Sequence, residues 1–279
     1  MNQNKIQSQV RLIDFSLLQE IKTSEKIKQL KEYTSEYTNE YTNEYTSEYT
    51  KYTNPILKVS DITIAYKTKY SLVEKIKYPL FLNELKKMHN QKEYFVNLIQ
   101  YYHSFISLLD FLERNGIVSL SCEINNIYLN EQQPIISTYI FLDDLDMKKL
   151  DNINVYYLPY SAHVLHFLNT ECCDGTELSS NNMNEISDTF ITGLDKLHIF
   201  SKDYLKEYAK ECTKECTKEY KRQGLKECIK ENIIKWSHFS VAIMFLILLN
   251  KLPEDTWIYK FKQHLLDIIM QNKKNELFI

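Results

Sequence analysis

The stretch Leu112–Ser137, LERNGIVSLSCEINNIYLNEQQPIIS, decides the fold that we expect for this chain. An apolar-periodic helix runs into it from Tyr94 and stops at Asn115-Gly116, a strong turn signal. A β-branched pair, a polar loop and two short apolar runs follow, which predicts a helix, a glycine turn, a loop ending in asparagine and a short hairpin. In order, these segments are Ile117-Val118, the loop up to Asn126, Asn126–Leu129, a turn at Glu131–Pro134 and Ile135-Ile136.

This order of elements resembles the catalytic loop of the protein kinases. That loop reads I-V-H-x-D-x-K-x-x-N-I-x-L and is followed by P-x-I-x-D-F-G. Here Ile117-Val118 occupy the first two places and Asn126–Leu129 occupy the last four. The resemblance covers Ile56 to Met270 at best. It implies a protein-kinase-like fold with a reduced small lobe and a helical large lobe.

The middle of the motif departs from the family. Ser119 stands at the position of the histidine and Ser121 at the position of the catalytic aspartate. Thr138 stands at the metal-binding aspartate of D-F-G, so that Asn126 is left as a vestige of the metal-holding set. A serine is not an anionic base at neutral pH, and one neutral asparagine is a weak ligand for Mg²⁺. We therefore expect no intact catalytic residue and no metal site.

The small-lobe motifs of the family are also missing from the sequence. Glu20 fits the position of the helix glutamate in the Lys–Glu pair of kinases, but no V-A-I-K strand precedes it and its lysine is not identified. No G-x-G-x-x-G is present. We expect no cofactor, with ATP and Mg²⁺ bound only if residual kinase activity persists. The 4 glycines are Gly116, Gly175, Gly193 and Gly224, all in the expected large lobe.

Composition and charge are those of an ordinary globular protein. The 279 residues are 44% hydrophobic and 25% charged, with a formal net charge of -3. This balance gives no reason to expect a nucleic-acid or membrane partner. The start, MNQNKIQSQV, has no apolar leader, and the apolar run Phe239–Leu249 is shorter than the ~18 residues of a bilayer span. We expect a cytoplasmic protein whose 6 cysteines are free thiols.

Repeats and residue usage set the expected organisation of the chain. Asn, Lys, Ile and Tyr are frequent, which is typical of an AT-rich genome such as that of a large DNA virus. Divergent kinase-like proteins of such viruses resemble this chain, which would place it in the host cytoplasm or the virion. The expected units are an N-terminal helical segment at 1–31, a low-complexity EYTx repeat at 32–54, remnant small-lobe strands and a linker at 55–79, and a large lobe at 80–279 with a charged repeat insert at 203–231.

Hydrophobic periodicity predicts an α+β, mostly helical chain. Short strands are expected at Ile56–Val59 and Ile62–Tyr66. The segment Ile233–Leu249 is apolar on all sides, which indicates a buried central helix, and Ser237 keeps the serine of the kinase pattern D-x-x-S-L-G there. The expected helices are Leu12–Leu30, Leu80–Met88, Tyr94–Leu112, Met183–Phe200, Lys206–Glu231, Ile233–Leu249 and Trp257–Met270.

His163, His166, Cys172 and Cys173 make the best case in the sequence for a metal site. Histidines three residues apart on an apolar helix are more often packed in a core, and adjacent cysteines rarely bind one ion together. Cys122 lies in the loop with no histidine nearby in the sequence, so that thiol catalysis is not expected. We therefore expect no zinc site.

Three functional hypotheses follow. The first is a catalytically inactive kinase-like protein, a pseudokinase, that acts by binding another protein. The second is a residual or unconventional protein Ser/Thr kinase, whose autophosphorylation would be lost in Asn126→Ala. The third is an unrelated helical interaction protein. Convergence of Ser121, Asn126 and Thr138 on one site would distinguish kinase-like descent from a chance resemblance.

Overall fold

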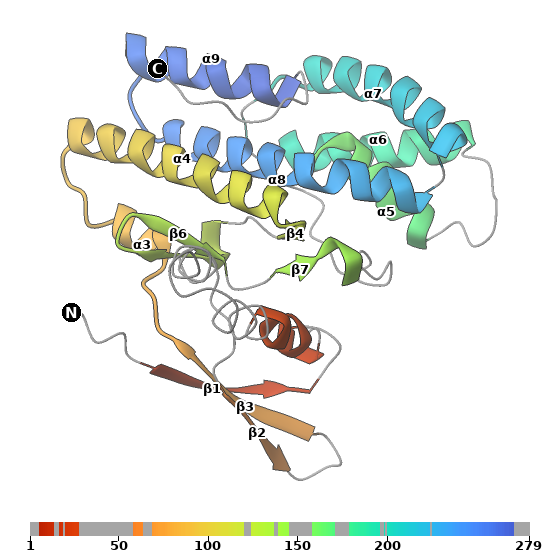
Figure 1. Cartoon of the computed structure of the whole chain (residues 1–279). Helices are drawn as coiled ribbons and strands as arrows, with labels where there is room; N and C mark the ends of the chain where they lie inside the picture. Colours follow the sequence, from red (N-terminus) through yellow and green to blue (C-terminus); the bar gives the residue numbers. More distant parts are fainter. Residues whose placement is uncertain are drawn as a thin grey trace.

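The fold is α+β and mostly helical, as the sequence predicts. The computed structural model describes residues 6–13, 17–18, 20–27, 58–63, 69–119, 124–136, 139–144, 158–170, 179–195, 198, 200–223 and 225–270. A small antiparallel sheet lies at one end of the molecule and a body of helices lies at the other (Figure 1). The first tetrad repeat, predicted for 32–54, lies outside the described residues.

Three antiparallel strands in the order β1-β3-β2 form the small sheet. Gln7 is paired with Lys75, and Arg11 is paired with Ser71. Arg11 and Lys75 therefore point to the same face, because side chains an even number of residues apart share a face of a sheet. The strands are β1 at Ile6–Leu12, β2 at Lys58–Thr63 and β3 at Lys69–Ile76.

Two predictions for this region are wrong. The segment 1–31 is not helical throughout, because polar and apolar residues alternate along IQSQVRL and this segment forms β1. The strands expected at Ile56–Val59 and Ile62–Tyr66 do not form separately, since both Val59 and Ile62 belong to β2. The second strand, β3, lies further along the chain in the alternating segment KYSLVEKI.

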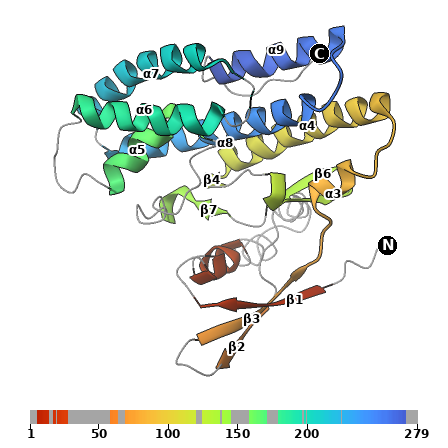
Figure 2. The same ribbon diagram turned by 180° about the vertical axis from the view of Figure 1, so that it is seen from behind.

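A helix at residues 17–18 and 20–27, here called the N-terminal helix, follows β1. It lies within the helix predicted for Leu12–Leu30. Leu17 and Val73 are fully buried between the helix and the sheet, where Ile13, Ile21 and Val59 pack against them. Both views place this helix between the sheet and the body of helices (Figures 1 and 2).

The far end of the N-terminal helix contacts the body of helices. Ile27 is fully buried in the main core, and the Lys26 Nζ lies 4.3 Å from the centre of the Phe141 ring. A cation over an aromatic face contributes about 0.5–1 kcal/mol at a partly exposed site. The helix therefore joins the two ends of the molecule by packing as well as by chain connection.

Helices α3 to α9 form the body. The helices predicted to begin at Leu80, Tyr94, Met183, Ile233 and Trp257 are confirmed. Their ends differ from the prediction by a few residues, except that the helix predicted from Ile233 already begins at Leu225. An eleven-residue helix, α5, precedes α6. The bounds are α3 at Phe81–Leu85, α4 at Gln91–Arg114, α5 at Tyr160–Thr170, α6 at Ser180–Asp195, α7 at Lys202–Gln223, α8 at Leu225–Leu249 and α9 at Thr256–Met270.

Helix α8 is the centre of the body, as predicted. It packs against α4, α5, α7 and α9. A group of aromatic rings joins it to α3, α4 and α9, with the Tyr102 and Phe245 ring centres 5.3 Å apart. The segment Asn232–Leu249 is long and apolar enough to cross a membrane, but 83% of it is buried inside the protein. The rings of this group are Phe81, Tyr102, Phe105, Phe245 and Phe261.

The charged repeat predicted at 203–231 is not a single surface helix. It belongs to two helices, since α7 ends at Gln223 and α8 begins at Leu225. Tyr208 and Ala209 are buried, and Cys212 packs against the main core. The i,i+4 stripe of the repeat thus faces inward in this part of α7, because tyrosine and cysteine are apolar enough to be buried there.

Two short β-structures connect the long helix α4 to α5. Strand β4 at Ile117–Val118 pairs with β7 at Ile140–Phe141, which the sequence does not predict. The predicted hairpin is confirmed as β5, Ile127–Asn130, and β6, Gln133–Ile136. Its turn is tighter than predicted and is centred on Glu131, whose φ is 58°. The Leu129 amide donates to the Pro79 carbonyl at 2.9 Å, which fixes the linker from the small sheet onto the hairpin.

Candidate functional site

Two of the four predicted site positions, Ser119 and Asn126, are described, and they lie next to β4 and β5. Ser119 directly follows β4 and is 7% exposed. Asn126 ends the short 3₁₀ turn Ile124–Asn126 directly before β5, and only its backbone is described. Ser121 and Thr138 lie outside the described residues.

The described neighbours of these positions are held together by two strand pairings. Val118 pairs with Ile140, and Ile127 pairs with Ile136. Along the chain, β4 is followed by the β5–β6 hairpin. The hairpin is followed by β7, which pairs with β4. These pairings bring together the backbone on both sides of the predicted loop. The side chains of Ser121, Asn126 and Thr138 lie outside the described part of the structure, and so do their mutual positions.

Gly116 makes the turn between α4 and β4. Its φ is +57°, a left-handed conformation that glycine adopts without strain from a Cβ atom. Its carbonyl accepts a hydrogen bond from the Leu142 amide at 2.7 Å, so that the turn is fixed to the segment after β7. The Asn-Gly turn signal thus predicts this geometry correctly, and it sets the direction in which β4 leaves the long helix.

A buried ion cluster lies on the face of the small sheet that the N-terminal helix covers. Glu20 on the helix pairs through one carboxylate oxygen with Arg11 of β1 and through the other with Lys75 of β3. The Glu20 side chain is 5% exposed, against 25% for Arg11 and 16% for Lys75. We call Arg11, Glu20 and Lys75 the Glu20 cluster.

In the Glu20 cluster, one carboxylate lies between two basic side chains. Burial, followed by the nearby Arg11 guanidinium, lowers the pKa of Lys75 from 10.5 to about 7. An arginine keeps its proton at any such pH, so Lys75 is the member that gives up its proton first. The lysine therefore changes charge near neutral pH, while the Arg11 guanidinium stays protonated.

Sequence reading identifies Glu20 and misses both of its partners. Arg11 lies in a segment that is predicted as helix, and Lys75 lies 55 residues away from Glu20 in a strand that is not predicted. The signal that would find them is the alternation along IQSQVRL and KYSLVEKI. Every second residue of β1 from Gln7 to Arg11 lies on one face of the sheet, and so do Val73 and Lys75 of β3. This is the face that the N-terminal helix covers.

The histidines weighed as metal ligands lie on α5. His163 is buried, and its ring meets the Phe190 ring edge-on with centres 5.2 Å apart. His166 is half-buried, and Cys172 and Cys173 lie outside the described residues. In the described part of the chain, no three His, Cys, Asp or Glu side chains come close enough to hold a metal ion.

The candidate site therefore has two parts, which are the loop between β4 and β5 and the Glu20 cluster on the small sheet. A comparison of the chain with protein-family models and with curated proteins finds no match.

Proposed function

We propose that this chain is a kinase-like protein that lacks phosphotransfer activity and acts by binding another protein. The observation that carries the proposal is the ion pair between Glu20 of the N-terminal helix and Arg11 of the strand before it. Active protein kinases form such a pair between a strand lysine and a helix glutamate. Arg11 supplies the cation that is missing from the sequence motif, and it comes from the strand that precedes the helix.

The order of elements supports kinase-like descent. Strands, linker, short helix, long helix, loop and hairpin follow one another from β2 to β6. Kinases have the same order where the small lobe leads into the large lobe. Helix α8 adds a buried Ser237 at the place of the serine in the central helix of the family. Several independent features thus fall in one order, although each of them is common by itself.

The residues at the chemical positions support the loss of activity. Phosphoryl transfer requires an aspartate to accept the hydroxyl proton and acidic ligands for Mg²⁺. The aligned positions here carry Ser121 and Thr138, and Ser119 replaces the histidine. Hydroxyl groups neither accept that proton at neutral pH nor neutralise a dication. A protein that keeps the frame without this chemistry acts through its surface.

Calorimetry with Mg-ATP and an assay of phosphate release test the proposal together. We expect no saturable binding of Mg-ATP by the native chain up to about 1 mM and no release of phosphate. Thr138→Asp should restore metal-dependent nucleotide binding, because it places a carboxylate at the aligned metal position. Ser137→Asp is the matched control and should not do so. Turnover by the native chain would contradict the proposal, as would equal gains in the two variants.

A residual kinase that binds ATP is the second candidate. The Arg11–Glu20 ion pair favours it, because active protein kinases hold the helix glutamate to a cation of a neighbouring strand. This candidate predicts autophosphorylation with Mg-ATP that Asn126→Ala abolishes. Detection of phosphate incorporation by mass spectrometry would select it over the inactive form.

A further inference from the structure

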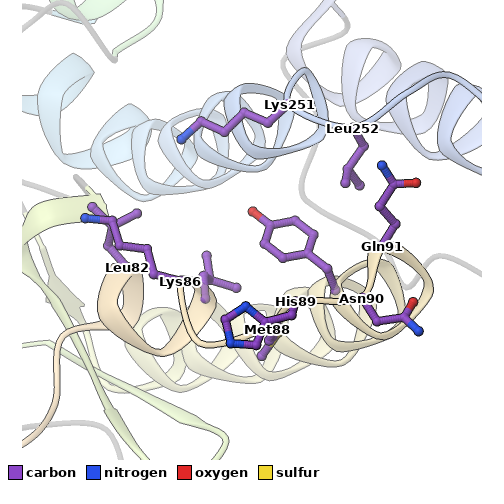
Figure 3. Close-up of a pocket in the computed structure, with 10 residues that line it drawn as sticks. Leu82, Lys86, Met88, His89, Asn90, Gln91, Lys251 and Leu252 are labelled. Atoms are coloured by element: carbon purple, nitrogen blue, oxygen red, sulfur yellow. The ribbon is translucent and has the colours of Figure 1, made fainter.

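A pocket of about 320 Å³ lies on the body of helices, and none of its lining residues belongs to the loop or to the Glu20 cluster. Its walls come from α3, from the turn into α4 and from the segment that follows α8 (Figure 3). The elements that carry it are anchored in the main core through Phe81 and Leu85 of α3 and Leu249 at the end of α8. The pocket is thus a formed feature between segments that are distant in sequence.

The lining of this pocket has two kinds of side chain. Leu82, Met88 and Leu252 are half-buried and give it an apolar surface. Lys86, His89 and Lys251 are exposed and lie at its edges, with Lys251 on the α8 side and the other two on the α3–α4 side (Figure 3). Among the residues that the structure describes, no acidic side chain lines the pocket.

The two lysines of the pocket are available for an external partner. Within the described part of the chain, neither Lys86 nor Lys251 forms an ion pair, whereas the neighbouring Lys87 is paired with Glu84 at 2.5 Å. The chain as a whole has a net charge of -3, so this basic rim is a local feature and not a consequence of overall charge. Charge complementarity therefore selects an acidic occupant.

We propose that this pocket docks a segment of a partner protein in which an acidic side chain stands next to a bulky apolar one. The apolar surface would receive the bulky side chain, and Lys86 and Lys251 would pair with the acidic one from opposite sides. A bare anion is a poorer occupant, because the basic groups lie on the exposed rim and apolar groups line the walls. The inference rests on the protein-binding part of the proposed function and not on kinase-like descent.

Fluorescence polarisation with defined synthetic peptides tests this docking site. The probes are labelled peptides of about ten residues that contain Leu or Phe at varied spacing from Asp or Glu, and a second set in which Asn or Gln replaces the acids. We expect binding by members of the acidic set and weakening of about tenfold by the amide replacements. The double variant Lys86→Ala/Lys251→Ala should weaken binding by about tenfold, since an exposed ion pair contributes about two- to fivefold.

Lys87→Ala is the matched control, because it removes a neighbouring charge, in the turn after α3, that does not line the pocket. It should leave peptide binding unchanged. Labelled methyl groups give a second readout, in which the Met88 signal should shift when peptide is added. Both lysines replaced in the double variant are exposed in the native chain. Thermal unfolding of the double variant checks that it keeps the fold.

Four results would overturn the docking proposal. Two concern the peptides, namely the absence of binding across the acidic set and equal binding by the amide set. The third is an equal loss of peptide affinity in Lys87→Ala and in the double variant. The fourth is displacement of the peptide by inorganic phosphate but not by chloride at equal ionic strength. Self-association that the double variant abolishes would assign the pocket to a second copy and would also overturn it. Mg-ATP turnover tests the proposed function separately, since no residue that lines the pocket belongs to the loop.

Discussion

Lys75 makes the stability of this fold depend on pH. Burial, followed by the nearby Arg11, lowers the pKa of its ammonium group from 10.5 to about 7 in the native state. In the unfolded chain the group returns to its ordinary pKa near 10.5. Between these two pH values the unfolded state binds more protons than the native state. Stability must therefore rise with pH in this window, which is the sign required for a lysine whose folded pKa is lowered.

The size of the effect follows from the same two pKa values. The slope approaches about 1.4 kcal/mol per pH unit where the unfolded lysine is protonated and the native one is not. Integration from about pH 7.5 to about pH 9.5 gives a gain of about 2–3 kcal/mol in the free energy of unfolding from this one group. Lys75→Met removes the titrating group and should remove the gain.

Urea unfolding of the native chain and of Lys75→Met at the two pH values measures this difference. Other titrating groups, such as the buried tyrosines with raised pKa values, are common to both proteins and cancel in the comparison. Lys87→Met is the control, since Lys87 is an exposed lysine paired with Glu84. Parallel pH profiles for the native chain and Lys75→Met would refute the reasoning. They would mean that Glu20 outweighs burial and Arg11 and holds the Lys75 proton.

Five further substitutions, at four positions, test the packing of the fold. Glu20→Gln should lower the free energy of unfolding by about 3 kcal/mol, because it leaves two partly buried cations without their carboxylate; a loss below about 1 kcal/mol in urea would contradict this. Phe245→Ala should cost about 3–5 kcal/mol in calorimetry, whereas Trp257→Ala, 58% exposed, should change stability by less than about 0.5 kcal/mol. Gly116→Ala should cost about 1 kcal/mol from its φ of +57° alone, since nothing lies within 4 Å of the added Cβ, and Gly116→Asn should cost less by the same measurement.

The helices of the body are predictable because their signals are local. In α4 the buried residues recur on one face, from Leu98 to Leu112, and Asn90 caps its start by accepting from the Lys92 amide. In α8 the apolar composition alone indicates a central position. The Asn-Gly turn after α4 likewise fixes a conformation that depends on few residues. Local periodicity and caps thus account for most of the body.

The small sheet is harder to predict because its evidence is divided among distant segments. The alternation in Ile6–Leu12 is short, and Leu12 also fits the start of the following helix. Strand β3 contributes Lys75, whose partner Glu20 is far away in sequence, so no local pattern links them. The β4–β7 pair has two residues in each strand, too few for any periodicity to be seen. Tertiary contacts decide these elements.

Under the proposed function, the Glu20 cluster gives a physical reason why the small-sheet packing would persist after loss of catalytic residues. A buried carboxylate between Arg11 and Lys75 holds the N-terminal helix on the sheet, and removal of Glu20 takes this shared partner from both basic side chains. Selection for a stable fold alone is therefore enough to keep this pair. A loop aspartate that serves only to accept a proton or to bind Mg²⁺ has no such structural partner, so a serine or threonine can replace it at little cost in stability. On this reasoning, Thr138→Ala should be nearly neutral for unfolding while Glu20→Gln is not. Equal losses of stability in the two variants would contradict the proposed difference between residues kept for packing, such as Glu20, and positions that have lost a catalytic role, such as Thr138. The proposed function depends on that difference.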